Sequence, residues 1–134
     1  MSGKEILVDT NIILYLLDGS DTLVEILQGK DIYLSFITEL ELIGYKENTI
    51  KREDQIAELL NECSIISMNN LIKERYVEIR KKHHLKLADA IIAATAIVFD
   101  MPIITADKQF KTVDGLKLIS YQHSINPINP KKAN

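Results

Sequence analysis

Apolar residues occur along the chain in short runs, and these runs alternate with segments in which apolar residues recur at helical spacing. The runs predict strands at residues 6–8, 32–36, 64–67, 103–105 and 116–121. The segments between them predict helices at residues 12–17, 21–27, 38–45, 51–61, 70–83 and 87–99. Ser20, and either Asn69 or Asn70, are expected to cap two of these helices. Strands that alternate with helices are typical of an α/β domain with a mainly parallel sheet.

The last of these helices, over residues 87–99, is apolar on almost every side and is predicted to be buried. Asp89, in its first turn, is the exception. A first-turn Asp commonly stabilises the helix N-terminus, by about 0.3–1 kcal/mol. Ile92 and Ala93 share the face of Asp89, however, so its carboxylate is expected to be partly buried. A buried charge needs a partner or a cation.

Three further acids are placed where they can meet Asp89. Asp9 follows the first predicted strand, Asp107 follows the fourth, and Glu41 lies one helical turn after the second. Ligands of open parallel sheets bind at the carboxyl ends of the strands, so these acids are expected to lie at one edge. Each also has a structural explanation. Asp9 can cap the next helix, Thr38 and Glu41 fit a capping box, and Asp107 can cap a short turn.

Four carboxylates in one place favour a metal site over four separate capping roles. Clustered carboxylates repel one another unless they are protonated or bind a cation. A ligand set made only of oxygen suits Mg²⁺ or Mn²⁺. Zinc spacing is absent, and His83 and His84 follow two lysines, which favours solvent exposure over metal binding.

Length, charge and cysteine content limit the class of protein. The 134 residues suit one domain, predicted over residues 1–121, with an extended or disordered tail over residues 122–134 that contains Pro127 and Pro130. Cys63 is the only cysteine, which excludes an intrachain disulfide. The sequence shows neither a signal peptide nor an apolar run long enough to span a membrane. Together with the single cysteine, this pattern predicts a cytoplasmic protein. The net charge of −3 argues mildly against a general nucleic-acid-binding protein.

Four short motifs occur in order along the chain. They are Val8-Asp9-Thr10-Asn11, Ser35-Phe36-Ile37-Thr38 through Glu41, Leu87-Ala88-Asp89-Ala90-Ile91-Ile92-Ala93-Ala94-Thr95-Ala96, and Thr105-Ala106-Asp107-Lys108-Gln109-Phe110. The first motif is weak alone, the third is specific, and the ordered set is strong. Together they resemble the PIN-domain proteins, in particular the VapC-like toxins of toxin–antitoxin pairs, from about residue 6 to residue 121.

The resemblance implies a three-layer α/β/α sandwich with a Rossmann-like sheet and the activity of a Mg²⁺- or Mn²⁺-dependent endoribonuclease. It implies that four acids bind the metal and carry out catalysis, and that two polar residues support them: Asp9, Glu41, Asp89 and Asp107, and Asn11 and Thr105. It also implies a cognate antitoxin and a homodimer. Many relatives have a second acid where this chain has Gln109, which puts a second tightly held metal in doubt. Many also have Pro in place of Ala88.

Basic residues near the third and fourth motifs are candidate RNA contacts. They are Arg80, Lys81, Lys82, Lys86 and Lys108. Cations in the last turn of a helix are favourable whatever the function, so this pattern alone is not specific. A local basic rim would nonetheless let a chain of net charge −3 bind a polyanion.

Other functions remain open from the sequence. A PIN fold retained only to bind a partner is one alternative, although the presence of all four acids argues against it. A haloacid-dehalogenase-like, Mg²⁺-dependent phosphatase is a weaker one, because that class needs a second Asp where Asn11 stands. A receiver domain would need paired acids at the first strand, and these are missing.

Overall fold

A computed structural model of the chain describes residues 3–122. Within them, five strands form one sheet in the order β3-β2-β1-β4-β5, and every neighbouring pair is parallel. The strands are β1 (Glu5–Val8), β2 (Asp31–Ser35), β3 (Ser64–Ile66), β4 (Ile103–Thr105) and β5 (Leu118–Ser120). The predicted parallel sheet is thus confirmed. Nearly all of the predicted tail, from residue 123 on, lies outside the described residues.

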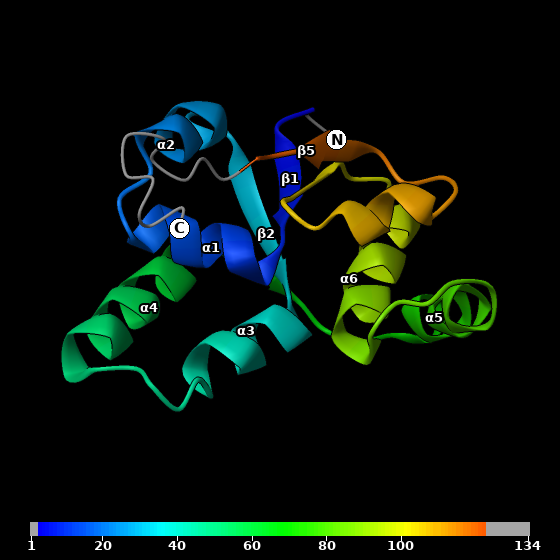
Figure 1. Cartoon of the computed structure of the whole chain (residues 1–134), viewed down its shortest axis with the longest axis horizontal. Helices are drawn as coiled ribbons and strands as arrows, with labels where there is room; N and C mark the ends of the chain where they lie inside the picture. Colours follow the sequence, from blue (N-terminus) through cyan, green and yellow to red (C-terminus); the bar gives the residue numbers. More distant parts are fainter. Residues whose placement is uncertain (1–2, 123–134) are drawn as a thin grey trace, which may run out of the picture.

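Helices cover both faces of this sheet. Residues 3–122 contain α1 (Thr10–Leu17), α2 (Asp21–Leu27), α3 (Phe36–Ile43), α4 (Ile50–Glu62), α5 (Asn70–Lys82), α6 (Leu87–Val98) and the 3₁₀ helix η1 (Lys108–Thr112). In Figure 1, α1, α2 and α4 lie on one side of the sheet and α5 and α6 on the other. The predicted three-layer α/β/α architecture is therefore confirmed. None of the described helices is long and apolar enough to cross a membrane.

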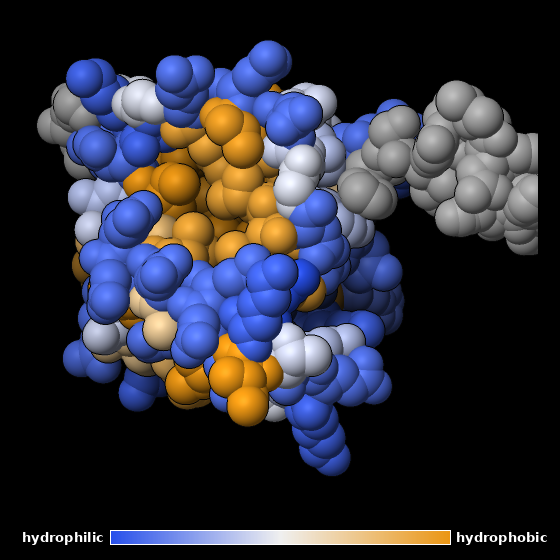
Figure 2. All heavy atoms as spheres, turned by 90° about the vertical axis from the view of Figure 1, so that its left-hand side faces the viewer, coloured by the Kyte–Doolittle hydropathy of each residue, from blue (hydrophilic) through white to orange (hydrophobic). Residues whose placement is uncertain are grey.

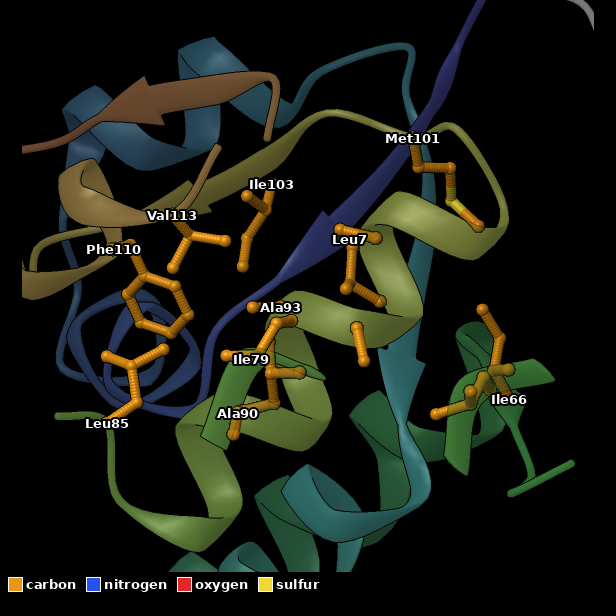
Figure 3. Close-up of a cluster of buried hydrophobic side chains, with 14 residues drawn as sticks. Leu7, Ile66, Ile79, Leu85, Ala90, Ala93, Met101, Ile103, Phe110 and Val113 are labelled. Carbon is orange, nitrogen blue, oxygen red and sulfur yellow. The ribbon is translucent and has the colours of Figure 1, made fainter. Parts of the chain in front are cut away.

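Alternating side chains of the central strands divide the core into two clusters. Leu7 and Ile103 pack with the α5 and α6 residues, whereas Ile6, Val8 and Ile104 pack with α1, α2 and α4. Figure 3 shows part of the first cluster, in which Ala93 of α6 faces the sheet residues Leu7 and Ile103. The small alanines let α6 pack closely against the sheet, and this fixes the position of its first turn at the carboxyl ends of the strands.

Capping side chains set where several helices begin. Ser20 caps α2 and Asn69 caps α5, as predicted. The predicted start of the third helix at Thr38 is wrong, because α3 begins at Phe36. Ser35 is extended at the end of β2, with φ −69° and ψ 149°, and its Oγ accepts a hydrogen bond from the Ile37 amide at 3.2 Å. The capping box of Thr38 and Glu41 is therefore also wrong, which leaves Glu41 available for another contact.

Candidate active site

The four sequence-predicted acids line one hollow at the carboxyl edge of the sheet. Its volume is about 320 Å³. The residues around it are Asp9, Thr10, Asn11, Leu14, Glu41, Leu42, Tyr45, Lys86, Ala88, Asp89 and Asp107. The acids come from the end of β1, from α3, from the first turn of α6 and from the end of β4. The structure thus brings together side chains that are up to 98 positions apart in the sequence (107 minus 9).

Asp9 is buried, and both of its carboxylate oxygens accept a hydrogen bond. Oδ1 accepts from the Thr10 amide at 2.8 Å, and Oδ2 accepts from the Thr105 hydroxyl at 2.6 Å. Burial raises the pKa of Asp9 above its usual value, and the nearby Asp107 and Glu41 carboxylates raise it further, against the opposing effect of these hydrogen bonds. Asp9 caps α1, as predicted, but its second oxygen is held by β4 and not by the helix.

The buried hydroxyl of Thr105 connects two of the acids. It donates to Asp9 Oδ2 and accepts a hydrogen bond from the Asp107 amide at 3.0 Å. Asp107 in turn caps η1, because its Oδ1 accepts from the Gln109 amide at 2.9 Å. The Thr105 hydroxyl therefore contacts the side chain of Asp9 and the backbone of Asp107.

Glu41 is held by a residue that sequence reasoning missed. The Thr10 hydroxyl donates to Glu41 Oε1 at 2.6 Å, and the hydroxyls of Thr10 and Thr38 lie 3.1 Å apart. A hydroxyl has one proton, so the Thr10 proton goes to the carboxylate and Thr38 donates to Thr10. These contacts join α1 to α3 across about thirty positions of sequence, and no local pattern indicates them.

Asp89 is half-buried and accepts no hydrogen bond from any residue between 3 and 122. Burial raises the pKa of Asp89 from 3.8 to about 6, followed by the charges of Asp9, Asp107 and Glu41, while Lys86 lowers it. A helix N-terminus favours the charged form of an acid and so lowers its pKa. Burial and like charge therefore outweigh the helix end, and the purely structural explanation of Asp89 does not account for its surroundings.

The donor set suits a divalent cation, although the side chains would have to approach one another to hold it. No group of three or more acidic, histidine or cysteine side chains in residues 3–122 is spaced to bind a metal as it stands. The four acids nevertheless face one hollow and offer only oxygen, which Mg²⁺ and Mn²⁺ prefer. A cation there would also favour the charged forms of Asp9 and Asp89, which opposes both pKa shifts. The donor chemistry of the residues present therefore fits such an ion, and their present spacing is wider than an ion needs.

The remaining predicted residues fall at different distances from the acids. Asn11 is exposed and lines the same hollow, as does Lys86. Lys108 lines the neighbouring hollow, which also includes Asp107. Arg80, Lys81 and Lys82 form the basic last turn of α5, where Lys82 lines a separate, smaller hollow. The structure thus brings two of the five candidate RNA contacts, Lys86 and Lys108, beside the acids.

Comparison with known proteins agrees with the motifs. The model of the PIN domain family matches residues 6–116. A chain of the toxin–antitoxin complex from Klebsiella pneumoniae is 32% identical, with a TM-score of 0.75, and the match covers 88% of this chain and 99% of that one. A chain of the VapBC2 complex from Rickettsia felis, bound to a DNA fragment from its promoter, has a TM-score of 0.78 at 22% identity, covering 88% and 99%.

A chain of FitAcB from Neisseria gonorrhoeae is 25% identical, with a TM-score of 0.70, and the match covers 86% of this chain and 96% of that one. Among curated protein sequences, none matches the chain. The chain belongs to the PIN domain family. Within that family, its fold is similar to that of chains from toxin–antitoxin complexes, VapBC2 among them.

Proposed function

We propose that this chain is a metal-dependent endoribonuclease and the toxin of a toxin–antitoxin pair. The observation that carries the proposal is the convergence of Asp9, Glu41, Asp89 and Asp107 on one hollow at the carboxyl edge of the sheet. Their order along the chain matches the family's motifs, and the family match supports a nuclease. In this proposal the four acids hold Mg²⁺ or Mn²⁺, and Asn11 and Thr105 support them.

A divalent cation supplies two things to phosphodiester hydrolysis: it polarises the scissile phosphate and lowers the pKa of an attacking water. The chain's own residues do the rest. The Thr105 and Thr10 hydroxyls orient Asp9 and Glu41, and one of the carboxylates accepts the proton that the water loses. Lys86, which lines the same hollow, attracts the phosphate. Neither a histidine base nor a covalent nucleophile is needed.

The direct test is cleavage of single-stranded RNA with Mg²⁺ or Mn²⁺, with and without EDTA. We expect cleavage only with free metal, and its loss in Asp9→Asn and in Asp89→Asn. Asp54→Asn is the matched control, because Asp54 is an exposed α4 residue and the substitution makes the same change in charge. Circular dichroism confirms that each variant is folded. EDTA-resistant cleavage, or full activity in both site variants, would contradict the proposal.

The same assay separates the alternatives. A partner-binding domain without catalysis cleaves no RNA under any condition, whereas a phosphatase hydrolyses phosphate monoesters and leaves the RNA chain intact. Asn11, in place of the second Asp that such phosphatases use, is exposed at the edge of the hollow.

An apolar surface supports the antitoxin part of the proposal. Figure 2 shows an apolar area, surrounded by hydrophilic side chains, on the side of the molecule where α1, α2 and α4 lie. Leu14, Leu17, Leu59 and Leu60 on these helices are only partly buried against the second core cluster. An amphipathic antitoxin segment would cover such a surface. Co-purification with the product of a neighbouring gene, with loss of RNA cleavage in the complex, tests this.

The homodimer and the cytoplasmic location stay predictions. Sedimentation equilibrium over a range of protein concentrations tests the first, and cell fractionation tests the second.

A further inference from the structure

A second hollow lies beside the candidate active site and differs from it in chemistry. It has a volume of about 360 Å³, within the range of small-molecule sites. Asp107 lines both hollows, so their contents would be neighbours. Two tyrosines, Tyr15 and Tyr121, and two lysines, Lys108 and Lys111, line the second one. Aromatic faces beside cations are what single-stranded nucleic acids bind.

The aromatic wall of this hollow is fixed from several directions. The rings of Tyr15 and Tyr121 have centroids 6.1 Å apart and planes tilted by 40°. The Tyr121 hydroxyl and Ser20 Oγ form a hydrogen bond of 3.0 Å. The Tyr121 amide donates to the Thr105 carbonyl at 2.8 Å, which ties it to the strand whose next residues lead to Asp107. A base stacked on these rings would therefore lie at a defined distance from the acids.

Both lysines of the hollow are exposed, and neither forms an ion pair with any residue between 3 and 122. By contrast, Arg52 pairs with Asp18 and Lys117 pairs with Asp100. Lys108 and Lys111 lie on η1, directly after Asp107, which caps that helix. Their charges are thus available to a phosphate bound close to the acids.

We propose that this hollow is a nucleotide subsite, in which an unpaired base stacks on Tyr121 and Tyr15 and the adjoining phosphate contacts Lys108 and Lys111. The inference rests on the proposed ribonuclease activity and adds that the RNA is unpaired where it binds beside the acids. A base within a duplex has its faces covered by neighbours, so the residue next to the cut has to be unpaired. Stacking tolerates any base, so this subsite selects single-stranded structure and not sequence.

Binding in the absence of cleavage tests the subsite independently of catalysis. The probe is a short, fluorescent, single-stranded 2′-O-methyl oligoribonucleotide, titrated with the full chain in EDTA. Tyr121→Ala is expected to weaken binding about tenfold, the effect of losing one stacked base. Tyr121→Phe keeps the ring and is expected to bind like the wild type. A duplex of the same sequence is expected to bind both proteins equally.

A double substitution, Lys108→Gln with Lys111→Gln, changes only exposed side chains and keeps the test valid if Tyr121→Ala fails to fold. It is expected to reduce the slope of log K against log salt by about 1. Lys73→Gln, at an exposed α5 position that lines neither hollow, is the control and is expected to leave this slope within error of the wild type.

Two results would overturn the proposed subsite. One is a lysine variant that binds with the affinity and the salt slope of the wild type. The other is a Tyr121→Ala variant in which binding of single-stranded and of duplex RNA is weakened equally. Loss of RNA cleavage in the aspartate variants bears only on the proposed function, because no cleavage enters this measurement.

Discussion

The two hollows on either side of Asp107 have similar volumes, about 320 and 360 Å³, and opposite character. One is lined by four carboxylates, and burial, followed by repulsion from the other three, raises the pKa of Asp89 to about 6. The other is lined by two tyrosines and two exposed lysines. The acids of the first hollow suit a cation, and the lysines of the second suit a phosphate. The two hollows therefore suit different tasks, catalysis in the first and substrate binding in the second. In the proposed function, this local positive charge is what lets a chain of net charge −3 bind a polyanion.

Asp107→Asn is expected to have the largest effect, and opposite effects in the two hollows. It removes one proposed metal ligand, so RNA cleavage is expected to fall by about a hundredfold or more. It also removes a negative charge beside Lys108, so RNA binding in EDTA is expected to tighten. Asn is a good cap, so η1 is expected to persist. Cleavage rates and anisotropy titrations measure the two effects. Asp114→Asn is the matched control, and unchanged cleavage in Asp107→Asn would contradict the assignment.

Thr105→Val is expected to cost about 1.5–3 kcal/mol of unfolding free energy near neutral pH, because the buried Asp9 carboxylate loses a donor. Urea denaturation measures this cost. Thr112→Val removes the hydroxyl of an exposed residue on η1 and is expected to cost less than about 0.5 kcal/mol. Equal costs for the two variants would show that the link between Thr105 and Asp9 contributes nothing particular.

Asp89→Asn is expected to stabilise the metal-free protein near pH 7. A folded-state pKa of about 6, above the ordinary 3.8, means that the native state holds this proton more tightly than the unfolded state. The contribution of Asp89 to the free energy of unfolding is therefore most favourable below about pH 4, and it is lost as pH rises to about 6. Asn remains uncharged, so the variant avoids this loss. Near pH 7 its free energy of unfolding is expected to exceed that of the wild type by about 1–2 kcal/mol, once solvent screening of a half-buried group is allowed for.

Melting curves in EDTA across this pH range measure the difference between wild type and Asp89→Asn. The stabilisation is expected to shrink toward zero below about pH 4. If Asp89 only favours the start of α6, the variant is instead less stable near neutral pH, by up to about 1 kcal/mol.

Thr10→Val is expected to have the smallest effect. Glu41 is exposed, so loss of the hydrogen bond from Thr10 is expected to cost less than about 1 kcal/mol of stability. The carboxylate is no longer oriented, so the metal concentration for half-maximal cleavage is expected to rise a few-fold. Thr10→Ser restores the hydroxyl and is expected to restore that concentration. The same concentration in all three proteins would remove Thr10 from the site.

Much of the fold could be predicted from the sequence, because the spacing of apolar residues and the identity of capping residues are local signals. The strand at residues 103–105 and the helix at residues 21–27 were predicted with their observed bounds. The start of α3 was not, because Ser35 and Thr38 are both good caps and only the extended end of β2 selects Ser35. The 3₁₀ form of η1 was also missed.

For the candidate site, the sequence indicated that acids follow the strands, and the family resemblance implied support from Asn11 and Thr105. Neither indicated which acid Thr105 contacts, nor that Thr10 holds Glu41. The hydrogen bond from Thr105 to Asp9 joins residues 96 positions apart, and the one from Thr10 to Glu41 joins residues 31 apart. Spacing along the chain contains no signal for contacts of this range. The pairing of Tyr15 with Tyr121 was missed for the same reason, because each tyrosine alone is an ordinary half-buried residue.

The central claim is that the four acids act together to hold one kind of ligand, a divalent cation. Titration with Mn²⁺, followed by calorimetry or by the electron paramagnetic resonance of the free ion, tests it without RNA. We expect saturable binding by the wild type, at least about tenfold weaker binding by Asp9→Asn and by Asp89→Asn, and wild-type binding by Asp54→Asn. Binding that is absent from the wild type, or equal in all four proteins, would contradict the claim.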